Sequence, residues 1–137
     1  MRTSLFYCTA IFFLFTLSVQ AQVCTLGLGG EDTKTIAQVF QLNEEQLTKL
    51  DSLRSEKEIE MRLIEDDIKK LFDTQPQSTP EELTTLAEKY KVLKAKMEVA
   101  SLEYDKKLLT AFNQKQYERY MALCEAAFRE PIALEPQ

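Results

Sequence analysis

Residues that break helices are confined to a few positions, and this constrains the fold more than any other feature of the chain. All three glycines lie within residues 22–31, and between residues 31 and 130 the only prolines are Pro76 and Pro80. Before these prolines, positions at a spacing of three or four residues form one helix face, which is apolar except at Arg54 and Lys57. Its apolar residues are Leu47, Leu50, Met61, Ile64, Ile68 and Leu71. The sequence predicts a first long helix from Asn43 to about Asp73.

Residues 74–80 interrupt this helical pattern. Pro76 cannot continue a helix, whereas Thr79-Pro80-Glu81-Glu82 supplies an N-cap, a proline at the first helical position and a capping-box glutamate. A connection this short predicts that the next helix runs antiparallel to the first. The second helix again has apolar residues on a 3,4 spacing, at Leu83, Leu86, Tyr90, Leu93, Met97, Ala100 and Tyr104.

One short pattern occurs twice, at residues 42–46 and 112–116. The copies are Leu42-Asn43-Glu44-Glu45-Gln46 and Phe112-Asn113-Gln114-Lys115-Gln116. In each copy the asparagine can cap a helix, and the glutamine at N3 can reach back to the cap residue. The second copy therefore predicts a corner near residue 113 and a third helix to about Glu130, where Pro131 ends it.

These elements together predict an all-α fold. It consists of a long antiparallel helical hairpin, a third C-terminal helix and a short N-terminal helix over residues 32–40. Residues 43–130 form the helical domain. Residues 22–42 are otherwise expected to be a flexible N-terminus, and residues 131–137 a frayed tail.

Residues 1–21 have the pattern of a secretory signal peptide. Arg2 gives a basic start, the stretch from Leu5 to Val19 is mostly apolar, and Val19-Gln20-Ala21 offers a cleavage site. The apolar stretch of ~15 residues is shorter than the ~20 that a membrane span needs. A lipoprotein signal is the alternative because Cys24 follows closely, although Val23 is not the small residue expected before a lipid-modified cysteine. We expect cleavage, with no membrane insertion of the product.

Two cysteines remain once Cys8 is removed with the signal peptide. Cys24 and Cys124 can form a disulfide within the chain, stay as free thiols, or link two chains. The sequence leaves all three states open.

Composition disfavours several functions. Without residues 1–21 and their one cation, the chain has 16 basic and 22 acidic residues, a net charge of −6, which is unfavourable for general binding of nucleic acid. It contains no histidine, the usual base of serine and cysteine nucleophiles. The densest acidic run, Glu65-Asp66-Asp67, points in three directions on a helix and is interpreted as a solvated face. We predict no enzyme activity, no metal site and no cofactor.

The two long helices offer candidate interaction surfaces. Lys89, Lys91, Lys94 and Lys96 cluster without an intervening acid; we favour a solvated face that pairs with the acidic first helix over a strip that attracts acidic partners. Helices this long cannot bury every apolar stripe within one monomer, so a client-binding or dimer surface is expected. Its candidate residues are Met61, Ile64, Ile68, Leu93, Met97 and Tyr104.

The repeated pattern resembles the two Leu-Thr-x-x-Gln motifs of the Spy/CpxP-like periplasmic proteins, which stand at helix starts. Asn43 and Asn113 replace threonine, and Phe112 replaces leucine. The likeness covers roughly residues 32–130. It implies a cradle-like homodimer in the periplasm. The function it implies is that of an ATP-independent chaperone or envelope-stress accessory protein that binds unfolded proteins without covalent chemistry.

The chain departs from this family in two respects. Its acidic balance differs from the basic concave face of the chaperone members, and it lacks the histidines of metal-sensing relatives. The alternative function is that of a dedicated regulatory partner for one envelope sensor protein.

Overall fold

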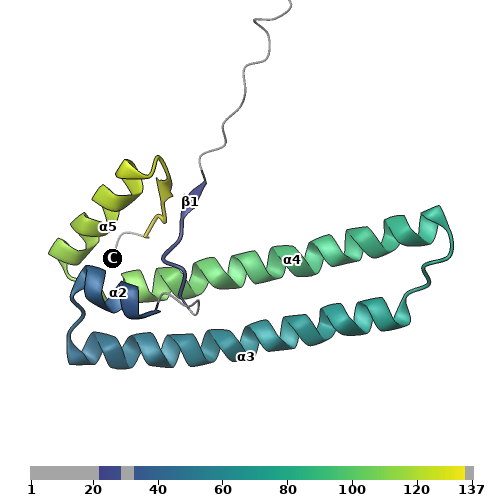
Figure 1. Cartoon of the computed structure of the whole chain (residues 1–137), viewed down its shortest axis with the longest axis horizontal. Helices are drawn as coiled ribbons and strands as arrows, with labels where there is room; N and C mark the ends of the chain where they lie inside the picture. The colour runs from purple at the N-terminus through teal and green to yellow at the C-terminus, as the bar shows by residue number, and fades with distance from the viewer. Residues whose placement is uncertain (1–21, 29–32, 135–137) are drawn as a thin grey trace, which may run out of the picture.

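The computed structural model describes residues 22–28 and 33–134; the predicted signal peptide and residues 135–137 lie outside the described residues. The elements in chain order are β1 (Val23–Cys24), α2 (Thr33–Phe40), α3 (Glu44–Thr74), α4 (Pro80–Leu109), α5 (Gln114–Ala126) and β2 (Glu130–Pro131). Helices α3 and α4 form a long antiparallel hairpin, so the predicted all-α fold is confirmed (Figure 1).

The three predicted helix starts are present. Asn43, Thr79 and Asn113 cap α3, α4 and α5, and in each case the side chain at N3 completes a capping box. Each box satisfies backbone donors that the first turn of the helix leaves unpaired.

The C-terminal end of α5 differs from the prediction. The helix ends at Ala126 rather than near Glu130, because Phe128 adopts a left-handed conformation with φ 54°. The backbone N–H groups of Phe128 and Arg129 bond to the carbonyls of Glu125 and Cys124, which is a Schellman motif. This stop was not predicted, because the residue at such a position is usually glycine and here is Phe128.

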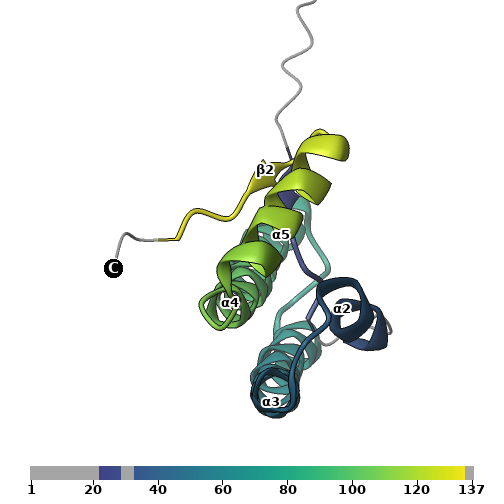
Figure 2. The same cartoon turned by 90° about the vertical axis from the view of Figure 1, so that its left-hand side faces the viewer.

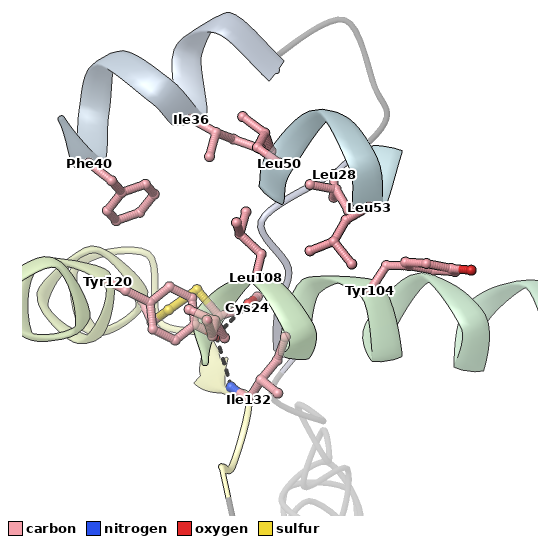
Figure 3. Packing of buried hydrophobic residues seen from close by; sticks show 12 residues of the cluster. Cys24, Leu28, Ile36, Phe40, Leu50, Leu53, Tyr104, Leu108, Tyr120 and Ile132 are labelled. Atoms are coloured by element: carbon pink, nitrogen blue, oxygen red, sulfur yellow. Dashed lines mark hydrogen bonds between the residues drawn. A yellow bond between two sulfur atoms is a disulfide. The ribbon is translucent and has the colours of Figure 1, made fainter. Parts of the chain in front are cut away.

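The shorter elements gather toward one end of the hairpin (Figures 1 and 2). We call this end the base: α2, α5, β1, β2, residues 25–28, and the adjoining parts of α3 (44–57) and α4 (100–109). The rest of the hairpin, residues 58–99, is the arm. One apolar cluster fills the base (Figure 3). It consists of Cys24, Leu28, Ile36, Phe40, Leu50, Leu53, Tyr104, Leu108, Leu109, Tyr120, Cys124 and Ile132.

The two chain ends, which the sequence predicted to be flexible, are fixed in this core wherever they are described. Cys24 forms a disulfide with Cys124, which settles the cysteine question in favour of a bridge within the chain. Strands β1 and β2 pair in parallel, and Leu28 and Ile132 are buried. The prediction of a flexible N-terminus over residues 22–42 and a tail over residues 131–137 is wrong for these parts, because covalent and backbone bonds tie them together.

A buried carboxylate fastens the N-terminal segment to α4. Asp105 is 1 % exposed, and its two oxygens accept the backbone N–H groups of Leu26, Gly27 and Leu28 at 2.7, 3.3 and 3.1 Å. Lys57 donates to the carbonyl of Leu28 from the opposite helix. The three N–H groups satisfy a charge that would otherwise be costly to bury. Sequence reasoning missed Asp105 because its partners are backbone groups 77 or more positions away.

Candidate interaction surface

The two repeated motifs meet in the base. The side chains of Gln46 and Gln116, each 7 % exposed, donate to one another's carbonyl oxygens at 2.7 and 2.9 Å. Each amide oxygen also accepts the backbone N–H of its own cap residue, Asn43 or Asn113. The motif residues thus join the starts of α3 and α5 as a structural corner, an arrangement that spacing along the chain does not reveal.

The apolar residues that precede the caps are also packed. Leu42 and Phe112 are half-buried against the core, and the rings of Phe112 and Phe40 lie 4.7 Å apart. All six motif residues are therefore occupied in holding the base together.

The arm buries few apolar residues and exposes many. Outside the base cluster, the buried apolar residues of the described chain are Ile64, Leu86 and Ala100. None of the other described elements covers the arm (Figures 1 and 2). Its exposed large side chains are Ile59, Leu63, Phe72, Leu83, Tyr90, Val92 and Val99. These side chains make the arm a candidate interaction surface.

Part of this surface forms a groove along the hairpin. The groove has a volume of about 730 Å³ and lies between α3 and α4. Val92, Ala95 and Val99 line it from α4, and Ile64 from α3. Four charged residues also line it, namely Glu60, Lys96, Glu103 and Lys107.

A buried tyrosine, Tyr104, also lines the groove. The hydroxyl of Tyr104 donates to Glu60 Oε2 at 3.0 Å, and Lys107 Nζ lies 4.4 Å from the centre of its ring. Burial, and then the hydrogen bond to the Glu60 carboxylate, raise the pKa of Tyr104 above 10.0, so the phenol stays protonated at neutral pH. Glu60 and Lys107 are thus engaged with Tyr104.

Of the six residues predicted as a client or dimer surface, Ile64 and Tyr104 line the groove and the other four do not. Ile64 and Tyr104 are buried, and Met61, Ile68, Leu93 and Met97 are half-buried. Their 3,4 spacing aligns them with Ile64 and Leu86, so these side chains hold α3 and α4 together. The exposed apolar residues of the arm lie mostly outside this spacing, although Leu83 and Tyr90 belong to it.

The lysines of α4 do not pair with α3 as favoured by the prediction. In the described part of the chain the ion pairs are Arg54–Asp51 and Arg62–Glu58, both within α3. Lys89 instead donates to Gln75 Oε1 at 2.8 Å, near the tip where the rings of Phe72 and Tyr90 meet. The interpretation of this strip as a solvated face agrees with the exposure of all four lysines, whereas the expected ion pairs with α3 are absent among the described residues.

Other kinds of site receive no support from the described residues. Within residues 22–28 and 33–134 no group of three or more acidic or cysteine side chains is placed to hold a metal ion. Over the same residues, no helix combines the length and the apolar character needed to cross a membrane. No protein-family model matches the chain, and neither the curated proteins nor the solved structures contain a significant match.

Proposed function

We propose that this chain is an ATP-independent chaperone that holds unfolded proteins on the arm without covalent chemistry. The observation that carries the proposal is the apolar surface of the arm: seven large side chains exposed on a hairpin that the base does not cover. A non-native polypeptide exposes apolar segments, and burial of these segments against the arm is favourable by about 25 cal/mol per Å².

The charges of the arm suit a binder that releases its clients. Lysines and acidic residues flank the apolar side chains, so contacts at the edge of the surface remain solvated and weak. The base supplies the complementary property, since its disulfide and buried hydrogen bonds keep the hairpin folded while the arm is free.

The proposed location is the periplasm. The support comes from the signal-like residues 1–21 and from the Cys24–Cys124 disulfide, since such bonds persist in oxidising compartments. A cradle-like homodimer remains a further prediction, and sedimentation of the mature chain tests it.

The test is suppression of light scattering by an aggregating model client at stoichiometric ratio. We expect the mature chain to suppress scattering, and the arm variant Ile59→Ser/Leu63→Ser/Val92→Ser/Val99→Ser to lose most of this effect. The matched control is Met121→Ser/Leu123→Ser, which removes exposed apolar residues from the base. No suppression by the unmodified chain, or equal loss with the control, would overturn the proposal.

The arm also fits the second candidate function, a dedicated regulatory partner, because mixed charges beside an apolar groove can select one complementary surface. Capture from an envelope extract separates the two candidates. A broad mixture of non-native proteins favours the chaperone, whereas one stoichiometric partner retained after washing at high salt favours the regulator.

A further inference from the structure

The groove on the arm has the features of a helix-binding site. Its lining from α4 comes from residues 92, 95, 96, 99, 100, 103, 104 and 107, which lie on one broad helix face at 3,4 spacing. From Val92 to Lys107 this face extends ~22 Å at 1.5 Å per residue. A third helix can pack into a groove between two antiparallel helices, because its side-chain ridges fit between theirs.

The backbone hydrogen bonds of α3 and α4 determine whether the groove favours an extended segment or a helix. The groove is built from helices, whose interior backbone N–H and C=O groups already bond to each other, so it offers no strand edge. An extended segment lying against Val92 and Val99 would lose water from its own backbone without gaining partners, so it would bind this groove less favourably than a helix. A helix satisfies its own backbone and brings only side chains to the groove.

Charge defines the occupant further. Two of the four charged groove residues are engaged with Tyr104, whereas Lys96 and Glu103 have no ion pair or hydrogen bond within the described residues. They lie seven positions apart on α4, which is two turns and ~10 Å. A helix beside them is favoured when it places an acid opposite Lys96 and a base opposite Glu103.

We propose that the groove between α3 and α4 binds an amphipathic helix that carries an acidic and a basic residue seven positions apart on its α4-facing flank. This inference rests on the proposed function, because it names the class of segment that the arm recognises. Helical segments of partly folded clients have this character.

The experiment uses the full mature chain and a labelled synthetic peptide of 18 residues. The peptide is an amphipathic helix with an apolar stripe and with a glutamate seven positions before a lysine on one flank. One control peptide exchanges these two charges, and a second carries a central proline on the polar face. Fluorescence anisotropy measures binding at low salt.

We expect the exchanged peptide to bind about fivefold more weakly, the size expected for two exposed ion pairs. The proline peptide is expected to bind at least tenfold more weakly. Lys96→Glu/Glu103→Lys should reverse the preference between the first two peptides. Val92→Ser/Val99→Ser should abolish binding, whereas Ile59→Ser/Leu63→Ser, equally exposed on the same arm but outside the groove lining, should leave it unchanged. Circular dichroism verifies that each variant remains folded.

The outcomes separate this inference from the proposed function. If the proline peptide binds as tightly as the helical one, or the charge exchange fails to reverse the preference, the helix proposal is overturned even where aggregation of the client is suppressed. If Val92→Ser/Val99→Ser dissolves a dimer of the chain and no peptide binds, the occupant is a second copy and the proposal is wrong. Tight peptide binding without any suppression of aggregation supports the groove and overturns the chaperone function.

Discussion

The base and the arm are built from the same two long helices, but they are stabilised by different means. In the base, segments distant in sequence converge on one apolar cluster, and a disulfide, the Asp105 hydrogen bonds and the Gln46–Gln116 pair connect them. In the arm, α3 and α4 contact chiefly each other, and large apolar side chains face solvent. The difference indicates that the base fixes the fold, whereas the arm leaves large apolar side chains exposed to solvent.

Removal of the disulfide is expected to cause the largest loss of stability, and to affect the base before the arm. Cys24 and Cys124 are 100 positions apart, and release of a loop this long lowers the free energy of unfolding by about 4–5 kcal/mol in the chain-entropy model. We expect Cys24→Ser/Cys124→Ser to show this loss in urea denaturation. Hydrogen exchange should increase first in α2, β1 and β2. Equal loss of protection in the arm and the base would contradict the division into two regions.

A matched pair of truncations on α3 tests the comparison within a single helix. Leu53 is 1 % exposed in the base and Leu63 is 62 % exposed in the arm. Leu53→Ala leaves a cavity and should lower the free energy of unfolding by about 3 kcal/mol. Leu63→Ala should change it by less than about 0.5 kcal/mol. Thermal and urea denaturation of both variants provide the measurement, and similar losses would show that the arm is covered in solution.

Local chemistry in the sequence predicted the helices well, because their signals lie within a few residues. The Asn43, Thr79 and Asn113 boxes and the break at residues 74–80 were all readable from adjacent side chains, and the elements they predicted are present. The 3,4 spacing of apolar residues likewise predicted the helix face along which α3 and α4 pack.

What the sequence could not predict depends on contacts between distant segments. The three N–H groups on Asp105 and the pairing of Gln46 with Gln116 join positions 70 or more apart, and no local pattern marks them. The exposed surface of the arm was difficult to predict for a related reason. A 3,4 spacing identifies an apolar face but not the neighbour that covers it, so it does not distinguish the half-buried Met61 and Met97 from the exposed Val92 and Val99.

Replacement of the buried Tyr120 is expected to lower stability by an intermediate amount. The same side chain makes the stability of the base depend on pH. Tyr120 donates to the carbonyl of Cys24 at 2.7 Å and accepts the N–H of Ile132 at 2.9 Å (Figure 3). Tyr120→Phe removes both bonds and should lower the free energy of unfolding by about 2 kcal/mol at pH 7. Denaturation at neutral pH measures this loss.

The dependence of the free energy of unfolding on alkaline pH provides a second measurement. Burial raises the pKa of Tyr120 above 10.0, although the hydrogen bond from Ile132 opposes the shift. The folded state therefore holds this proton more tightly than the unfolded state. The contribution of the protonated phenol to the free energy of unfolding is fully present below pH 10 and is lost as the pH rises through the folded-state pKa. Stability of the unmodified chain should fall in that range, and the fall should be shallower in Tyr120→Phe. An identical slope would show that the phenol is not buried.

The smallest expected effect is a gain in stability at the end of α5. Phe128 is 91 % exposed and has a φ of 54°, a left-handed conformation that costs a residue other than glycine roughly 1–2 kcal/mol. Phe128→Gly removes this strain and loses little burial, while the greater freedom of glycine in the unfolded chain offsets part of the gain. We expect the free energy of unfolding to rise by about 0.5–1 kcal/mol. The control is Gln41→Gly, at the matching Schellman position after α2 with φ 49°, which should give a similar gain. If Gln41→Gly stabilises the chain and Phe128→Gly destabilises it, the phenylalanine makes a contact in solution that offsets its strain.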